Sequence, residues 1–257
     1  MIDPTAKVHP GAEIGSGVSI GAYAVIGDQV RIADNCVIGP HVVVKGPTRI
    51  GESTRISQFS SIGDDPQDKK YQGEAESFLE IGSNNVIREF CSINRGTARG
   101  GGVTRVGNGN WIMAYVHIAH DCQVGNDTIF ANNATLAGHV HIDDYAILGG
   151  FTGVHQFCRV GCYSISAIAS IILKDVPPYL MVSGNSAKPS GLNRVGLKRN
   201  GFSDSSVEAL RKAYRIVYRE GLLLKNALKK LEGLAGEYKE VATFTRFIGQ
   251  SERGIVR

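Results

Sequence analysis

The feature that most constrains this chain is a repeat of six residues. Ile or Val occupies every sixth position from Val8 to Ile62, the pattern resumes at Ile81, and a third run extends from Val106 to Ile172. Of the 25 positions in these runs, 23 carry Ile, Val or Leu. A period of six matches neither an amphipathic helix nor a simple alternating strand. It predicts a parallel β-solenoid with three flat faces, in which one aliphatic side chain per face points inward.

Three hexads make a coil of 18 residues, so the 25 hexads predict about eight coils, stacked roughly 4.8 Å apart. Two segments, residues 64–80 and residues 98–105, break the repeat. Loops that leave a solenoid tend to lie on a binding face, so both segments are expected to border a site. The second segment lacks the GxxxxGK[ST] spacing of a phosphate-binding loop, which argues against nucleotide hydrolysis.

The repeat ends at DVPPYL, residues 175–180, because two prolines cannot continue a β-ladder. Helical patterns follow. Ser203 precedes an amphipathic stretch that ends at Gly221, and two further stretches cover about 222–233 and 237–249. The chain is therefore predicted to have a solenoid domain followed by a small α-helical domain that covers one end of it.

The two predicted domains, residues 1–180 and residues 181–257, differ in charge. Residues 181–257 hold 15 Lys and Arg against 7 Asp and Glu, a net charge of +8. Residues 1–180 hold 13 and 17, a net charge of −4. A basic surface attracts acidic partners, although charge alone does not distinguish a partner site from a solvated helical face.

Composition argues against several other classes of protein. The chain has no long apolar run, and MIDPTAKVHP lacks the basic-then-apolar order of a signal peptide, so a cytoplasmic protein without a membrane span is expected. The 5 cysteines form an odd number with no CxxC pair. This argues against a disulfide framework and a cysteine-rich zinc site, and we expect buried, apolar cysteines.

The 18-residue coil also predicts which polar side chains stack. His120 lies one coil before Gly138 and two coils before Gln156, while Asp121 lies one coil before His139. These residues are distant in sequence but are predicted to form one polar column at a solenoid corner, with rungs roughly 4.8 Å apart. Two further histidines flank the column, His117 and His155.

Three interpretations of this column stay open from the residues alone. A zinc site needs three good ligands, but Gln156 and a glycine accompany His120 and His139, and these are poor ligands. A general base fits His120, with Asp121 to fix its tautomer and the Gly138 N–H to stabilise an oxyanion. No Ser or Cys adjoins His120 as a nucleophile, which favours direct transfer to a bound hydroxyl. The third interpretation is a hydrogen-bonded surface histidine.

With these motifs assembled, the chain resembles the UDP-N-acetylglucosamine acyltransferase family of lipid A biosynthesis. The resemblance runs from MIDPTAKVHP to RGIVR and is carried by HVVVKGPTRIG, QFSSIG, QDKKYQGE, INRGT, YVHIAHD, NNATLAGHVHIDD, GVHQFCRVG, DVPPYL, GLKRNGFS and RKAYRIVYR. It implies a left-handed parallel β-helix followed by an α-helical C-terminal domain. It also implies a homotrimer with active sites between solenoids. The implied reaction moves an R-3-hydroxyacyl group from acyl carrier protein to the glucosamine 3-hydroxyl of UDP-N-acetylglucosamine, the first step of lipid A biosynthesis.

The resemblance assigns roles to individual residues. His120 would be the general base, Asp121 its orienting partner and Gly138 the oxyanion donor. The residues that would contact the sugar, the nucleotide or the phosphopantetheine arm of the donor are Asp68, Lys70, His117, His139, Gln156, Asn193 and Arg199. The carrier protein's phosphopantetheine thioester is the donor, so neither a cofactor nor a metal is implied, and no nucleic acid partner is expected.

Three positions depart from the family pattern. Asn200 in GLKRNG stands where many members have a second arginine, and Asn94 in INRG stands where several have histidine. Ile168 stands where members that accept longer acyl chains typically have glycine. A branched side chain fills space that glycine leaves for the acyl tail, so a shorter acyl preference is expected.

Rival functions remain to be separated. The N-acyltransferase that acts later in the same pathway usually carries an extra N-terminal domain, whereas the repeat here begins at Val8. A zinc-dependent carbonic anhydrase of the γ type would contain stoichiometric metal, and a purely structural solenoid would lack activity. An acceptor with a 3-amino group in place of the 3-hydroxyl is a further alternative.

Overall fold

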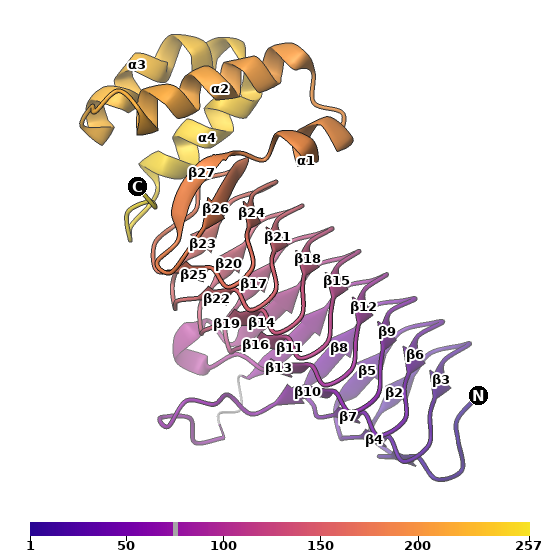
Figure 1. Cartoon of the computed structure of the whole chain (residues 1–257). Coiled ribbons are helices and arrows are strands. Elements are labelled where there is room, and N and C mark those ends of the chain that lie inside the picture. Colours follow the sequence, from indigo (N-terminus) through magenta and orange to yellow (C-terminus); the bar gives the residue numbers. More distant parts are fainter. Residues whose placement is uncertain (74–76) are drawn as a thin grey trace.

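Short parallel strands wind into a three-sided solenoid, and helices pack over one end of it (Figure 1). The computed structural model describes residues 1–73 and 77–257. Strands that follow one another as far as β25 lie in different sheets, and each strand as far as β22 pairs with the strand three places later. We name the three sheets A, B and C.

Sheet B holds the strands that lead into the predicted polar column. Its strands, in spatial order, are β1 (Lys7–Val8), β4 (Val25–Ile26), β7 (Val43–Val44), β10 (Ser61–Asp64), β13 (Ser92–Asn94), β16 (His117–Ile118), β19 (Thr135–Leu136), β22 (Gly153–Val154) and β25 (Ile171–Ile172).

Sheet C receives the chain after the column. Its strands are β2 (Glu13–Ile14), β5 (Val30–Ile32), β8 (Thr48–Ile50), β11 (Phe78–Ile81), β14 (Val103–Val106), β17 (Gln123–Val124), β20 (His141–Ile142) and β23 (Arg159–Val160).

Sheet A completes each coil and runs to the helical end. Its strands are β3 (Ser19–Ile20), β6 (Val37–Ile38), β9 (Arg55–Ile56), β12 (Val86–Ile87), β15 (Trp111–Ile112), β18 (Ile129–Phe130), β21 (Ile147–Leu148), β24 (Ile165–Ser166), β26 (Leu180–Ser183) and the antiparallel β27 (Lys188–Leu192). The parallel stack thus continues past DVPPYL, because β26 pairs with β24.

The core consists of the six-residue positions that the sequence predicts. Ile20, Ile26 and Ile38, for example, are each about 1% exposed. Two positions of the repeat are not Ile, Val or Leu. Phe130 is fully buried, and the Ser166 hydroxyl forms a hydrogen bond with the hydroxyl of the buried Thr152, with the two oxygens 2.8 Å apart. The expected burial of cysteine holds for Cys36, Cys91, Cys122 and Cys158, while Cys162 is half-buried.

Both breaks in the repeat are loops at the side of the solenoid. β10 ends at Asp64 and β11 begins at Phe78, which agrees with the first predicted loop. The second break is shorter than predicted, because the 3₁₀ turn η1 (Ala98–Gly100) is followed by β14 from Val103. The residues of the first loop at 74–76 lie outside the described part of the chain.

The helical end contains α1 (Arg194–Arg199), α2 (Asp204–Tyr218), α3 (Leu224–Glu237) and α4 (Lys239–Gly249). The three longer helices confirm the sequence prediction, and the Ser203 hydroxyl caps α2 by accepting from the Ser206 N–H at 3.1 Å. α1 and β27 were not predicted. In residues 1–73 and 77–257, we find no helix with the length and apolarity that crossing a membrane requires.

Candidate active site

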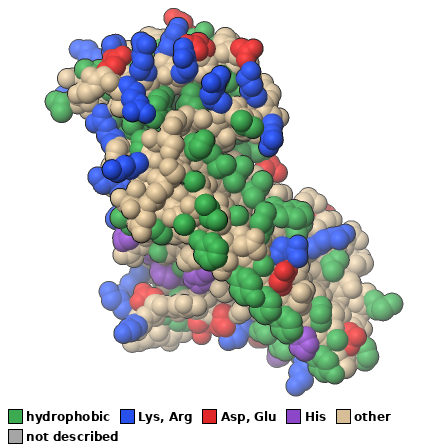
Figure 2. Space-filling model, in the orientation of Figure 1, with side chains coloured by type: hydrophobic (Ala, Val, Ile, Leu, Met, Phe, Trp, Pro, Cys, Tyr) green, Lys and Arg blue, Asp and Glu red, His purple; other side chains and the backbone are tan. Residues whose placement is uncertain are grey.

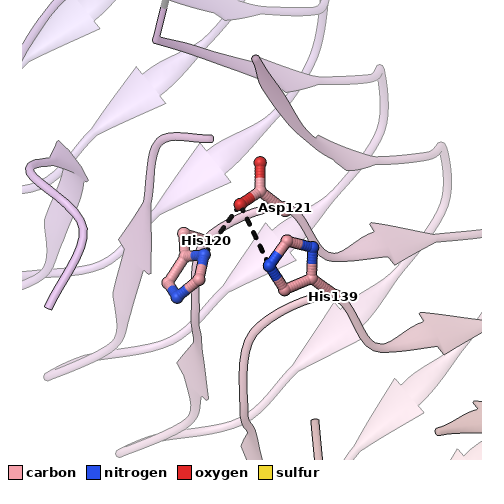
Figure 3. Close-up of side chains that lie close together, drawn as sticks. All are labelled: His120, Asp121 and His139. Atoms are coloured by element: carbon pink, nitrogen blue, oxygen red, sulfur yellow. Dashed lines mark hydrogen bonds and ion pairs between the residues drawn. The ribbon is translucent and has the colours of Figure 1, made fainter. Parts of the chain in front are cut away.

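The polar column lies where the chain passes from sheet B to sheet C, which we call the B–C corner. It comprises residues 119–122, 137–140 and 155–158 in three successive coils. The His139 N–H donates to the His120 carbonyl at 3.0 Å, and the Phe157 N–H donates to the Gly138 carbonyl at 3.2 Å. These bonds confirm the predicted stacking at intervals of 18 residues. Figure 3 shows His120 and His139 on either side of Asp121.

Asp121 is the buried centre of this corner. Its side chain is 0% exposed, and its backbone has φ of 62°, a left-handed conformation that Asp tolerates better than most residues. One carboxylate oxygen accepts from the Thr97 N–H, and the other accepts from the Thr97 hydroxyl, both at 2.8 Å. Burial alone would raise the pKa of Asp121, but hydrogen bonds from His120 and Thr97 hold it below its ordinary value.

His120 has its tautomer fixed by this carboxylate. The His120 Nδ1 lies 2.7 Å from the Asp121 Oδ2. A carboxylate with a lowered pKa only accepts, so Nδ1 carries the proton and donates it to the hydrogen bond. The Nε2 atom is left with a free lone pair, which is the state that a general base requires.

Gly138 permits the close stacking of the next coil on His120. A Cβ at position 138 would lie 2.6 Å from the His120 Cε1 and 2.7 Å from Nε2, so any larger residue would displace the imidazole. Within residues 1–73 and 77–257, the Gly138 N–H donates to no acceptor. An amide beside Nε2 without a partner has the chemistry of an oxyanion donor.

His139 closes the other side of the corner. Its Nε2 lies 3.6 Å from the Asp121 Oδ2, and its ring stacks on Phe157 with centroids 4.5 Å apart. Burial lowers the pKa of His139, and the nearby Asp121 opposes this only in part. A neutral His139 offers a ligand both a donor and an acceptor at neutral pH.

His117 occupies a different position from His120. It lies on β16, in sheet B, and its Nδ1 is 2.7 Å from the Ser92 hydroxyl. Burial lowers the pKa of His117, and the neighbouring His120 lowers it further. The two histidines of YVHIAHD are therefore not a matched pair of ligands.

A cavity of about 630 Å³ opens over the B–C corner. Five predicted site residues line it together, namely Asp68, Lys70, His120, His139 and Gln156. Asp68 and Lys70 come from the loop between β10 and β11, as the break in the repeat suggested. The cavity thus joins the loop and the histidine column into one site.

Sequence reasoning missed several residues of this cavity, including Gln67, Tyr71, Thr97, Arg99 and Phe157. The most informative is Thr97, whose two bonds to the carboxylate tie the η1 turn to Asp121. Gly100 in the same turn is required, because a Cβ there would collide with that carboxylate. The glycines of the segment ARGGGVTR were the available signal, since close approach of backbone to a side chain needs glycine.

Three predicted residues lie away from the B–C corner of the same chain. Asn193 caps α1 and donates to the Tyr163 carbonyl at 2.9 Å, at the corner between sheets C and A. Arg199 ends α1. Ile168, which is 72% exposed, lies between β24 and β25, at the corner between sheets A and B.

The two asparagines that depart from the family pattern also differ in their surroundings. Asn200 is exposed at the end of α1, and its amide donates to the Gly196 carbonyl at 2.9 Å. Asn94 is 3% exposed and donates to the Asp65 carbonyl at 3.0 Å. Asn94 therefore contributes to the base of the loop that carries Asp68 and Lys70.

Of the side chains that the structure describes, His120, Asp121 and His139 have ligand atoms close enough to hold a metal, within 4.8 Å of one another. Both oxygens of Asp121 already accept hydrogen bonds. A cation would have to displace the proton on the His120 Nδ1 or one of the Thr97 bonds. The donor set fits metal poorly, and the expectation of a metal-free site stays a prediction.

Comparison with known proteins finds similar chains over most of the sequence. A protein of Thiobacillus denitrificans named acyl-[acyl-carrier-protein]--UDP-N-acetylglucosamine O-acyltransferase is 57% identical over 203 residues, which are 79% of this chain and 78% of the relative. The crystal structure of Francisella novicida UDP-N-acetylglucosamine acyltransferase is 47% identical, with a TM-score of 0.98 over 100% of this chain and 94% of that chain.

The chain belongs to the UDP-N-acetylglucosamine O-acyltransferase family.

Models of this family and of its repeat match separate parts of the chain. The family model described as Udp N-acetylglucosamine O-acyltransferase, Domain 2 matches residues 175–256, and the bacterial transferase hexapeptide model matches residues 11–46 and 104–138. The Arabidopsis UDP-N-acetylglucosamine acyltransferase, at 38% identity, still has a TM-score of 0.86 over 100% of both chains. The predicted fold class, a left-handed parallel β-helix followed by a small α-helical domain, is confirmed, as is the acyltransferase class.

Proposed function

We propose that the chain transfers an R-3-hydroxyacyl group from acyl carrier protein to the 3-hydroxyl of UDP-N-acetylglucosamine, the first step of lipid A biosynthesis. Membership of the family supports the reaction class. The observation that carries the mechanism is the short contact of the His120 Nδ1 with the buried Asp121 carboxylate, because it leaves Nε2 as a base facing the cavity.

The reaction proceeds by direct transfer. Nε2 of His120 removes the proton of the sugar 3-hydroxyl as its oxygen attacks the thioester carbonyl carbon. The resulting oxyanion accepts a hydrogen bond from the Gly138 N–H. When the C–S bond breaks, the imidazolium returns its proton to the departing phosphopantetheine sulfur. Asp121 stabilises the imidazolium meanwhile and remains ionised.

The acceptor is held from the loop side of the cavity. Asp68 offers a carboxylate to sugar hydroxyls, and Lys70 offers a cation to the phosphate or acyl region of the substrate. Gln156, two coils above His120, has a side-chain amide suited to the nucleotide. His139 is neutral and lies beside the base, where it contacts the sugar.

A homotrimer completes the site. Ile168 lies at the corner between sheets A and B, Asn193 at the corner between sheets C and A, and Arg199 at the end of α1. None of them shares the B–C corner with His120 in one chain, so they reach the acyl chain and the nucleotide only if a second copy packs against that corner. The corner between sheets A and B, which we call the A–B corner, supports such packing. Its exposed rings form a stacked ladder of Tyr23, His41, Phe59, Phe90 and Tyr115, with centroids 4.9 to 5.2 Å apart.

An acidic carrier protein fits the charge of the helical end. Lys and Arg side chains gather over the helices in Figure 2, whereas hydrophobic side chains extend along the solenoid. The net charge of +8 in residues 181–257 favours encounter with an acidic partner. No sequence motif of nucleic acid binding accompanies this charge, so we propose no nucleic acid partner.

No cofactor is required, because the thioester itself activates the acyl group. The cytoplasm is the proposed location. The five free cysteines support it, since thiols stay reduced in that compartment.

Ile168 is proposed to shorten the acyl chain that the enzyme prefers. Its exposed side chain projects from the A–B corner, where a neighbouring copy would confine the acyl tail against it. The alternative acceptor, with a 3-amino group, would need less help from a base because an amine is the better nucleophile.

Transfer of a labelled hydroxyacyl group from carrier protein to UDP-N-acetylglucosamine tests the proposal. Labelled sugar nucleotide is the expected product, formed by purified protein treated with a chelator. Absence of transfer with every acyl chain length, or stoichiometric zinc that is needed for turnover, contradicts it. A parallel reaction with the 3-amino sugar nucleotide separates the two acceptors.

A further inference from the structure

Arg95, in the segment INRGT, is buried although it carries a permanent charge. It follows β13 directly and is 8% exposed. Its Nη1 donates to two backbone carbonyls of the solenoid, Gly46 and Gly63, both at 2.7 Å. A buried charge is costly unless its hydrogen bonds are satisfied, so this side chain is fixed to the body of the protein.

The remaining donors of Arg95 all point to the loop between β10 and β11. Nη2 forms an ion pair with the Asp65 carboxylate and reaches the Tyr71 hydroxyl at 3.3 Å. Nε reaches the Ser77 hydroxyl at 3.4 Å. These partners stand at the start, the middle and the end of the loop. One planar guanidinium therefore joins three points of the loop to the solenoid.

The residues that the loop presents to the cavity lie between two of these anchors. Asp68 and Lys70 line the cavity with His120, and they fall between Asp65 and Tyr71. The loop makes local bonds of its own, since the N–H groups of Lys70 and Tyr71 both donate to Asp68 at 3.0 Å. These local bonds shape the turn, but they do not fix its position over His120.

We propose that Arg95 is a positioning residue for the acceptor substrate, acting through the loop that carries Asp68 and Lys70. The inference rests on the proposed function, in which these two residues hold the sugar nucleotide. Arginine is required because a fork of donors has to meet several acceptors in fixed directions, which the single ammonium of lysine cannot do. Displacement of a binding loop by about 1 Å can cost on the order of 10²-fold in activity.

The test compares Arg95→Lys with the parent protein. The variant keeps the positive charge but loses the planar set of N–H donors that the guanidinium provides. We expect KM for UDP-N-acetylglucosamine to rise about tenfold or more, while KM for the acyl carrier protein thioester changes less than about twofold. The ratio of these two changes measures positioning of the acceptor. A general loss of folded protein lowers kcat alone.

Asp65→Asn and Tyr71→Phe remove single loop partners, and they serve if Arg95→Lys fails to fold. Asp65 has 57% of its side chain exposed, so the asparagine stays solvated, and its carbonyl oxygen can still accept from the buried Arg95 guanidinium. Both variants should raise KM for the acceptor by less than Arg95→Lys does. The matched control is Arg31→Lys, an exposed arginine 3.1 Å from Glu13 on sheet C, which should leave both constants unchanged.

A second readout is independent of activity. Trypsin cleaves after Lys69 and Lys70, so loosening of the loop should speed cleavage there in Arg95→Lys but not in Arg31→Lys. Unchanged cleavage together with an unchanged KM for the acceptor overturns the proposal. A fall in the unfolding midpoint with no change in either readout also overturns it, because Arg95 would then be structural only. If the parent protein transfers no acyl group, the proposed function fails while the cleavage rates still report on the loop.

Discussion

The B–C corner and the A–B corner have the same backbone but opposite chemistry. Asp121 and His139 have φ of 62° and 61°, and Phe59 and Phe90 have φ of 60° and 59°. At the B–C corner this left-handed position places a buried carboxylate against His120. At the A–B corner it places aromatic rings in an exposed stack.

The difference shows that the six-residue repeat supplies a scaffold and leaves function to the corners. The inward aliphatic residue forms the core of each coil. The third residue of each corner has its side chain outside that core, so it can be Asp, His, Phe or Tyr. What distinguishes the B–C corner is its connection to the two breaks in the repeat. Thr97 from one break supports the carboxylate, and the loop from the other closes the cavity.

The largest expected effect comes from Asp121→Asn. The amide cannot hold His120 in the base tautomer, and it presents an N–H where Thr97 needs an acceptor. We expect kcat to fall by up to about 10⁴-fold, as loss of an orienting carboxylate does in other enzymes. Steady-state transfer kinetics measure this, with circular dichroism as the check on folding. Activity within tenfold of the parent protein is inconsistent with the assigned role.

The second prediction concerns the aromatic corner. Phe90→Asp places a charge in the stack between Phe59 and Tyr115, where the proposed contact with a second copy would bury it. An interface hot spot costs on the order of 2 kcal/mol or more when it is lost, so the proposed trimer should dissociate at micromolar concentration. Light scattering reports the mass. A trimeric Phe90→Asp would place the interface elsewhere.

A smaller effect is expected from Ile168→Gly. Removing the branched side chain opens space at the A–B corner, and each buried methylene contributes about 0.8 kcal/mol. The preferred acyl chain should lengthen by a few carbons, with severalfold changes in kcat/KM between adjacent donors. A series of carrier protein thioesters measures the shift. If the parent protein already prefers the longest donors, Ile168 does not limit chain length.

The smallest effect is a dependence of stability on pH. Burial lowers the folded-state pKa of His117 and His139 from 6.5, so the unfolded chain takes up protons first as the pH falls. Stability should decline below about pH 6.5 until the folded-state values are passed. The lowered pKa of Asp121 stabilises the fold above its ordinary value of 3.8, and that contribution is lost in stronger acid. Urea denaturation at several pH values checks this. His117→Gln should flatten the first decline, and an unchanged slope would exclude His117 as its source.

The fold could be predicted from the sequence because the same six-residue pattern recurs in every coil. The period of six identified the three sheets, and the coil of 18 correctly stacked Asp121 on His139. Helices α2 to α4 followed from capping and amphipathic pattern. The short helix α1 and the strand β27 have too few residues for a periodic signal.

The site was predicted only in part, for physical reasons. Thr97 and Arg95 act across the breaks in the repeat, where the register is lost and no spacing shows which coil a residue faces. The A–B aromatic ladder is visible only after the coils are aligned. Ile168 lies away from His120 in one chain. Its proposed role depends on a second copy, so the fold of a single chain does not test it.

The most direct test of the account substitutes one histidine at each corner. His120→Ala removes the base, and His41→Ala removes a ring from the ladder between Tyr23 and Phe59. Transfer from hydroxyacyl carrier protein to UDP-N-acetylglucosamine should fall on the order of 10²–10⁴-fold in folded, trimeric His120→Ala. His41→Ala should retain the parent kcat wherever the trimer persists. Equal rates for the two variants would contradict the assignment of catalysis to the B–C corner.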